Sequence, residues 1–160
     1  MFPLLYLDVC CLNRPFDDQR QDRIRLESEA VLTILLMCEK EDIQLVESDV
    51  TYWEVDAISN FDRKEKVLAI LKAPHIRIIV TADILARGKE LEGFGLGGYD
   101  ALHLACAEAG NVDAFLTVDD GIISKVRHHA EFIKLNVMNP VTWFMERMWR
   151  EDANNDTTRN

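Results

Sequence analysis

Apolar residues along the chain gather into short runs and helical stripes that alternate with each other. Runs of strand length, several of them rich in β-branched residues, predict strands at residues 4–7, 43–48, 76–80, 114–118 and 132–137. Apolar residues recur at helical spacing over residues 26–41, 51–58, 64–73 and 82–93, within 95–110, and over 141–150 after Pro140. The pattern therefore predicts strands that are separated by helices.

This alternation favours an α/β fold. Helical crossovers connect parallel strands, so we expect a three-layer α/β/α sandwich around a parallel sheet of about five strands. The 160 residues suffice for one hydrophobic core, and we expect a single domain over residues 1–149. Pro74 is expected to close the helical stretch before the third strand, and the polar residues 150–160 are expected to form a disordered tail.

The composition is that of an ordinary globular protein. Hydrophobic residues make up 48% and charged residues 29%, and no apolar run reaches the roughly 18 residues that span a membrane. The N-terminus lacks the features of a secretory signal, so we expect a cytoplasmic protein with no membrane partner. The four cysteines form no C-x-x-C pair and no zinc-binding spacing with the histidines, which favours reduced thiols.

The formal net charge of −10 argues against tight nonspecific binding to nucleic acid, because that binding depends on Lys and Arg. It does not exclude a nuclease. Acidic residues that hold cations contribute to the negative charge, and local basic segments can still face a substrate.

Several acidic residues fall near the carboxyl ends of the predicted strands, where parallel sheets bind their ligands. Three of them stand at the ends of the first and fourth strands, and the other two lie on the helix after the second strand and at the start of the helix before the fourth. They are Asp8, Glu54, Asp100, Asp119 and Asp120. Each also has a structural explanation, as a turn residue, a residue at a helix N-terminus or a member of a capping box.

Together, these acids would repel one another and destabilise the fold unless something neutralised them. No Lys or Arg lies in the segments YLDVCC, GYDALHLA or LTVDD. A divalent cation with oxygen ligands is the simplest counter-charge, and Mg²⁺ or Mn²⁺ suits carboxylates and water. Such an ion can orient phosphate oxygens and activate water, which predicts phosphodiester hydrolysis.

These segments resemble those of PIN-domain proteins, a metal-dependent ribonuclease fold that includes VapC-like toxins of toxin–antitoxin pairs. The resemblance rests on YLDVCCLNRPF, TYWEV, GYDALHLACAEAG, LTVDDGII and NPVTWF, in that order, and covers nearly the whole chain. It implies a Mg²⁺- or Mn²⁺-dependent endoribonuclease, plausible as the toxin of such a pair. RNA would be the substrate, an antitoxin a possible partner and a homodimer the assembly.

The resemblance also implies roles for individual residues. Asp8, Glu54, Asp100 and Asp119 would form the acidic metal site, with Asp120 as a helper or substitute for Asp119. Thr117 would form a hydrogen bond within the site, and Asn13 would lie on its rim. Glu54 is chosen for its place in the helix after the second strand, and Asp49 is the alternate. His103 lies one helical turn from Asp100 and can border the site, although burial in the core explains it better than metal ligation.

Two groups of basic residues could meet an RNA backbone. The denser group is Arg14, Arg20, Arg23 and Arg25, directly after the Asp8 segment. The second is Lys125, Arg127, His128 and His129. A solvated face interleaved with acids is the competing interpretation of the first group. Trp143, Phe144, Met148 and Trp149 are expected to pack or to form a homodimer interface. The alternative to an enzyme is a PIN-like module that binds RNA or protein without cleaving.

Overall fold

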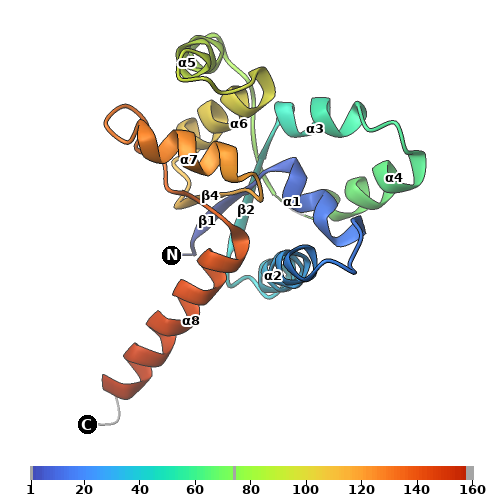
Figure 1. The fold of residues 1–160 in the computed structure, drawn as a ribbon, viewed down its shortest axis with the longest axis vertical. Helices are drawn as coiled ribbons and strands as arrows, with labels where there is room; N and C mark the ends of the chain where they lie inside the picture. The colour runs from blue at the N-terminus through green and yellow to red at the C-terminus, as the bar shows by residue number, and fades with distance from the viewer. Residues whose placement is uncertain (1, 74, 158–160) are drawn as a thin grey trace.

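A five-stranded parallel sheet forms the centre of the protein, and helices cover both of its faces (Figure 1). The computed structural model describes residues 2–73 and 75–157. The strands are β1 (Leu4–Leu7), β2 (Gln44–Ser48), β3 (Ile76–Ile78), β4 (Ala114–Leu116) and β5 (Val137–Met138), in the spatial order β3-β2-β1-β4-β5. All four neighbouring pairs are parallel. The predicted α/β fold is therefore confirmed.

The helices connect and cover these strands. In chain order they are α1 (Val9–Asn13), the 3₁₀ helix η1 (Arg14–Phe16), α2 (Asp22–Glu39), α3 (Asp49–Asp56), α4 (Phe61–Ile70), α5 (Ala82–Glu92), α6 (Gly98–Ala109), α7 (Asp120–His128) and α8 (Pro140–Thr157). Because every strand runs in the same direction, the segments that follow β1, β2 and β4 all leave from one edge of the sheet.

Side chains of the central strand alternate between the two faces of the sheet, as the strand geometry requires. Leu5 and Leu7 enter one core together with residues of α1, α2, α4 and α8. Tyr6 enters the other core, with Phe115 of β4 and residues of α5, α6 and α7. These two cores are the contacts between the three layers, and they explain why β1 is apolar at each of its positions.

The structure corrects three details of the sequence prediction. The segment after Asp8, which the sequence pattern predicts as a loop, is helical, as α1 and η1, and the Asp8 side chain caps α1. The fifth strand is Val137–Met138 instead of residues 132–137, since the backbone N–H groups of Phe132 and Ile133 donate to His129 O in a turn that follows α7. Pro74 lies outside the described residues.

The third correction concerns the C-terminal segment. Helix α8 continues through the residues that were expected to be disordered, as far as Thr157. The segment contains no Gly or Pro after Pro140 that would end the helix, and Arg147 Nε pairs with Glu151 at 3.0 Å, one turn later. Trp143 is buried in the first core and Phe144 packs against it, whereas Met148 and Trp149 are exposed.

No helix among the described residues has both the length and the apolar character needed to cross a bilayer.

Candidate acidic metal site

Four acidic side chains converge near the carboxyl ends of β1 and β4 and the helices beside them. Asp8 follows β1 and Asp119 precedes α7, and each caps the helix that it begins. Asp100 lies in the first turn of α6, and Glu54 lies in α3, which follows β2 directly. We call Asp8, Glu54, Asp100 and Asp119 the acidic site. The expected capping roles of Asp8 and Asp119 are present in addition to this convergence.

Asp8 is held by hydrogen bonds to both carboxylate oxygens. Its Oδ1 accepts from Val9 N at 2.8 Å, and its Oδ2 accepts from Thr117 Oγ1 at 2.8 Å and from Cys10 Sγ at 3.3 Å. Thr117 Oγ1 also accepts from Asp119 N at 3.2 Å. The buried Thr117 hydroxyl therefore links the two strand-end aspartates.

A buried chain of hydrogen bonds supports Glu54. Its Oε2 lies 2.7 Å from His103 Nε2, and His103 Nδ1 lies 2.6 Å from the Tyr6 hydroxyl, which lies 2.6 Å from Ser48 Oγ. His103 thus contacts Glu54 through one ring nitrogen and Tyr6 through the other. Burial raises the pKa of Tyr6 and keeps its hydroxyl protonated. This chain fixes Glu54 on α3 against α6.

The charges of the acidic site oppose one another. Burial, and then repulsion from Asp8, Asp119 and Glu54, raises the pKa of Asp100 to about 6. Burial also raises the pKa of Asp8, although His103 and the Thr117 hydrogen bond oppose that shift. Among the described residues, none of the four carboxylates forms an ion pair with Lys or Arg, and His103 alone pairs with one of them. The site therefore has an excess of negative charge that the described part of the chain does not neutralise.

The donor atoms fit a divalent cation. One ligand atom each from Asp8, Glu54 and His103 lies within 4.8 Å of the others, close enough to share an ion. Carboxylate oxygens suit Mg²⁺ and Mn²⁺, and an imidazole nitrogen is compatible with Mn²⁺ but not typical of Mg²⁺. Because His103 Nε2 already contacts Glu54 at 2.7 Å, His103 is better placed to orient the Glu54 carboxylate than to bind the ion itself. The geometry thus supports an acidic metal site without identifying the metal.

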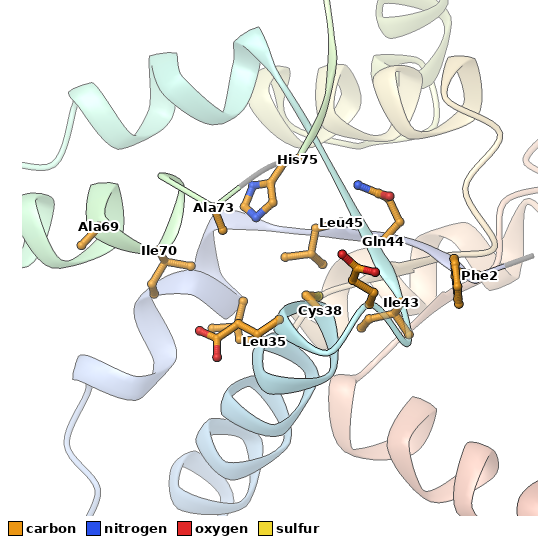
Figure 2. Close-up of a pocket in the computed structure, with 12 residues that line it drawn as sticks. Phe2, Leu35, Cys38, Ile43, Gln44, Leu45, Ala69, Ile70, Ala73 and His75 are labelled. Carbon is orange, nitrogen blue, oxygen red and sulfur yellow. The ribbon is translucent and has the colours of Figure 1, made fainter.

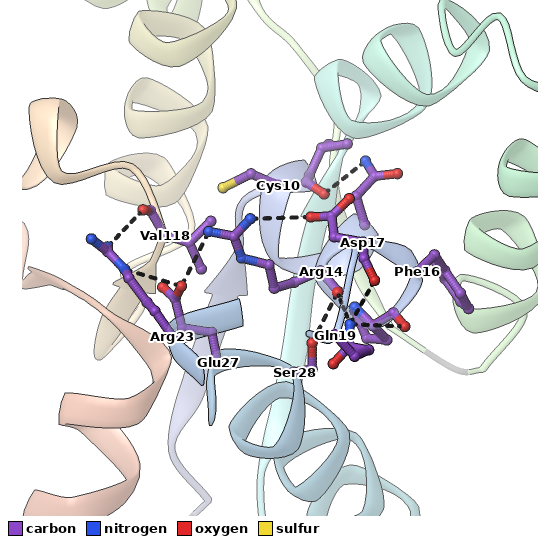
Figure 3. Close-up of polar contacts among 12 residues, drawn as sticks. Cys10, Arg14, Phe16, Asp17, Gln19, Arg23, Glu27, Ser28 and Val118 are labelled. Carbon is purple, nitrogen blue, oxygen red and sulfur yellow. Dashed lines mark hydrogen bonds and ion pairs between the residues drawn. The ribbon is translucent and has the colours of Figure 1, made fainter. Parts of the chain in front are cut away.

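A second group of acids is paired with arginines, and Figure 3 shows the contacts of Arg14 and Arg23 with Glu27 and of Arg14 with Asp17. Glu27 of α2 is 1% exposed and accepts from Arg14 Nη2 at 3.1 Å, Arg23 Nε at 3.2 Å and Asn139 Nδ2 at 2.6 Å. Arg14 also pairs with Asp17, and Arg23 binds both oxygens of Asp120 at 2.7 and 2.8 Å. We call Arg14, Asp17, Arg23, Glu27 and Asp120 the Glu27 cluster.

Asp120 therefore lies in the Glu27 cluster, although it follows Asp119 directly. Arg23 lowers the pKa of Asp120, which contrasts with the raised pKa of Asp100. Arg23 Nη2 also reaches Val118 O at 3.3 Å, so one guanidinium holds both ends of the Val118–Asp120 loop. Metal binding by Asp120 stays a prediction, and in this structure both of its oxygens already have a partner.

The other predicted residues lie around these two groups. Arg20 pairs with Asp18 at 2.6 Å, and Arg25 pairs with Asp22 at 2.7 Å, both on the surface. The side chain of Asn13 donates to Val9 O at 3.1 Å, within α1. Asp49, the alternate to Glu54, binds Arg77 and Val80 N and so ties α3 to β3. Lys125, Arg127 and His128 lie in the last turn of α7, away from Asp119, and His129 follows them.

The sequence analysis missed the role of Glu27. A signal for it was present, because Glu27 precedes Ala30, Val31 and Ile34 by three, four and seven residues and so lies on the apolar face of its helix. A carboxylate at such a position requires buried partners. Tyr6 gives a weaker signal of the same kind, as the one side chain of β1 with a hydroxyl.

A pocket of about 670 Å³ opens at the other edge of the sheet (Figure 2). It is lined by the start of β2, by the ends of α2 and α4, and by His75. His75 Nδ1 lies 3.0 Å from Glu47 Oε2, and both side chains are nearly buried. This pocket lies at the opposite ends of the strands from Asp8 and Asp119, so it does not belong to the acidic site.

Comparisons with known proteins agree with this geometry. A structure of FitAcB from Neisseria gonorrhoeae is similar with a TM-score of 0.53 and 18% identity, covering 85% of this chain and 97% of that chain. A structure of VapBC2 from Rickettsia felis bound to a DNA fragment from their promoter has the same score and identity, with 85% and 98% covered. At this identity, these likenesses concern the fold. No curated protein sequence matches the chain.

The family assignment rests on sequence. The model of the PIN domain matches residues 5–128, a segment that contains all four residues of the acidic site. The match thus spans β1 to α7, including the strand ends and helices that bring these carboxylates together. The chain belongs to the PIN-domain family.

Proposed function

We propose that this protein is a Mg²⁺- or Mn²⁺-dependent endoribonuclease that hydrolyses RNA phosphodiester bonds. The observation that carries the proposal is the acidic site itself: four carboxylates from separate elements converge, and the described residues provide no Lys or Arg to neutralise them. An uncompensated cluster costs stability, so a structural role alone does not explain it. Membership of the PIN-domain family supports the same conclusion.

Each residue of the site has a separate task in this proposal. Asp8, Asp100 and Asp119 hold the cation, and Glu54 completes the acidic set from α3. Thr117 fixes the Asp8 carboxylate through the 2.8 Å hydrogen bond, and His103 fixes Glu54. A bound divalent cation supplies charge neutralisation for a phosphate group and lowers the pKa of water. The raised pKa of Asp100 means that the chain alone holds this carboxylate partly protonated near pH 6.

The substrate backbone would be met by arginines outside the acidic site. All four predicted RNA-binding arginines are paired with carboxylates in this structure. Arg20 and Arg25 have exposed pairs with Asp18 and Asp22, which a phosphate can displace at little cost. Arg14 and Arg23 are tied to the buried Glu27, so their displacement costs more.

We also propose an antitoxin partner and a homodimer. The antitoxin is motivated by the likeness to the FitAcB and VapBC2 structures, because the sequence resembles VapC-like toxins of toxin–antitoxin pairs. For the second, Met145, Met148 and Trp149 form an exposed apolar face on α8, at spacings of three and four residues. Analytical ultracentrifugation of the parent and of Met148→Glu tests the dimer, which this substitution should dissociate.

The activity is tested by incubating the purified protein with single-stranded RNA and millimolar Mg²⁺ or Mn²⁺, with and without chelator. We expect internal cleavage that the chelator abolishes and that Asp119→Asn reduces at least about 100-fold. Asp62→Asn is the matched control, because Asp62 is an exposed acid on α4 that pairs with Lys66. Binding of RNA without cleavage would favour the alternative, a PIN-like binding module.

A further inference from the structure

Two half-exposed aromatic residues directly precede two residues of the acidic site. Trp53 precedes Glu54 on α3 and is 45% exposed, and Tyr99 precedes Asp100 on α6 and is 46% exposed. We propose that Trp53 and Tyr99 form a stacking platform for the bases of single-stranded RNA next to the acidic site. This inference rests on the proposed function, because it names how that site selects and positions its substrate.

The hydrogen bonds of α6 place Tyr99 on the side that faces α3. His103 Nε2 contacts Glu54 of α3 at 2.7 Å, so the His103 face of α6 is directed toward that helix. Tyr99 precedes His103 by four residues and therefore lies on the same face, one turn nearer the N-terminus of α6. Asp100 lies one turn from His103 as well, on its other side. Tyr99 and Asp100 thus lie on either side of His103 around α6, in the first turn of that helix.

The position of Trp53 on α3 complements that of Tyr99. Val50 and Val55 of α3 are buried, Glu54 is partly buried, and Trp53 lies at the solvent side of Glu54. Trp53 thus stands on α3 next to the residue that meets His103 of α6. Two partly exposed aromatic residues therefore directly precede residues of the acidic site, on two different helices.

Other aromatic rings nearby already have partners, whereas these two do not. Phe94 stacks with Phe132 at 5.5 Å between ring centroids, and Arg77 lies over Tyr52 at 4.2 Å. In the part of the chain that the structure describes, neither Trp53 nor Tyr99 has a ring contact, and Tyr99 has no hydrogen bond through its hydroxyl. At 45% and 46% exposure, both side chains offer accessible surface to a ligand.

The charge of the protein favours stacking over electrostatic attraction. The net charge is −10, and each of the four arginines predicted to bind RNA is paired with a carboxylate. A nuclease with this surface needs a source of affinity that does not depend on phosphate neutralisation. Stacking of bases on aromatic side chains supplies such affinity and tolerates any base sequence. It also selects single strands, because the bases of a duplex are already stacked on each other.

The test measures binding of a fluorescent single-stranded oligouridine RNA by anisotropy, with Mg²⁺ present and in the Asp100→Asn background, so that binding does not depend on cleavage. Trp53→Ala and Tyr99→Ala should each weaken binding by roughly 5- to 150-fold, with an unchanged salt dependence. Trp53→Phe and Tyr99→Phe should restore affinity to within about threefold, because the ring remains. Phe61→Ala is the control, since Phe61 is an exposed aromatic residue on α4 at 76% exposure.

The outcomes separate this inference from the proposed function. Loss of binding in the alanine variants, retained with phenylalanine, supports the platform even if the parent protein cleaves no RNA. Metal-dependent cleavage by the parent together with unchanged binding by both alanine variants overturns the platform and leaves the nuclease intact. Failure of the parent to bind single-stranded RNA also overturns it, as does equal weakening for duplex RNA. Binding of a protein partner at these two rings, with RNA binding unaffected, would be a third contradiction.

Discussion

Two groups of carboxylates lie side by side in this protein and differ in their counter-charges. In the Glu27 cluster, Glu27, Asp17 and Asp120 are each paired with arginine. In the acidic site, Asp8, Glu54, Asp100 and Asp119 share no Lys or Arg partner among the described residues. The adjacent residues Asp119 and Asp120 belong to different groups, so the same loop contains both arrangements.

The pKa values record this difference. Arg23 lowers the pKa of Asp120, and burial together with the neighbouring acids raises the pKa of Asp100 to about 6. A paired acid contributes to the stability of the fold, whereas an unpaired group of acids costs stability until a ligand neutralises it. The comparison teaches that the partner of a carboxylate, more than its place in the sequence, indicates whether its role is structural or functional.

The largest expected difference between the two groups is in activity. Asp119→Asn should reduce cleavage at least about 100-fold, because it removes a ligand from the acidic site. Asp120→Asn should retain most of the activity, because Asp120 is committed to Arg23. Initial cleavage rates at saturating Mg²⁺ compare the two variants. Equal losses would place both aspartates in the metal site and would remove the distinction within this loop.

The next largest effect is expected in stability. Glu27→Ala should lower the free energy of unfolding by roughly 3 kcal/mol, because it leaves the guanidinium groups of Arg14 and Arg23 without their buried partner. Glu27→Gln should cost less, since the amide oxygen can still accept a hydrogen bond. Urea unfolding curves measure both. A Glu27→Ala variant as stable as the parent would contradict the structural role of the cluster.

The pH dependence should distinguish Asp100 as a member of the acidic site. Its pKa is about 6 in the folded protein against an ordinary value of 3.8, so its contribution to stability is fully present below 3.8 and is lost as the pH rises through about 6. The metal-free parent should therefore lose stability relative to Asp100→Asn between about pH 4 and pH 7.

The response to metal should follow the opposite direction. Mg²⁺ requires the ionised carboxylate, so it should raise the melting temperature more at about pH 7.5 than at about pH 5. Melting curves with chelator and with Mg²⁺ at both pH values check this. A stabilisation by Mg²⁺ that is the same at both pH values would contradict the assignment of Asp100 to the metal.

The smallest effect is expected at the exposed ion pairs. Replacing Arg20 and Arg25 together by Ala should leave the urea midpoint unchanged, because both pairs are on the surface. If RNA phosphates displace Asp18 and Asp22, the double variant should reduce the salt slope of RNA binding by about 1.4, at roughly 0.7 per contact. An unchanged slope would show that these arginines serve only their surface pairs.

Sequence patterns were sufficient for the fold and for the convergence of the acids, and the reasons are physical. Strand and helix periods fix which elements alternate, and parallel connections bring the residues after β1 and β4 to one edge. Asp8 and Asp119 were therefore predictable from topology. Partners are a different matter, because they depend on three-dimensional packing: no spacing in the sequence connects Arg23 with Asp120, which lies 97 residues later.

Two further features could not be predicted for the same reason. The bond between Glu54 and His103 joins residues that are 49 positions apart, so the choice of Glu54 over Asp49 needed the structure to show where each side chain lies. The apolar pattern also could not predict the length of the fifth strand. Residues 132–136 are apolar enough for a strand, yet the backbone N–H groups of Phe132 and Ile133 are used in a turn that follows α7.

The most direct test of the central claim, that the acidic site is neutralised by a divalent cation, compares melting temperatures of the parent and of Asp100→Asn with chelator and with millimolar Mg²⁺. Without metal, Asp100→Asn should melt at a higher temperature than the parent near neutral pH, because one charge of a repelling group is removed. With Mg²⁺, the parent should gain stability and the variant much less. Equal responses to Mg²⁺ in the two proteins, with no stabilisation by the substitution in chelator, would contradict the claim.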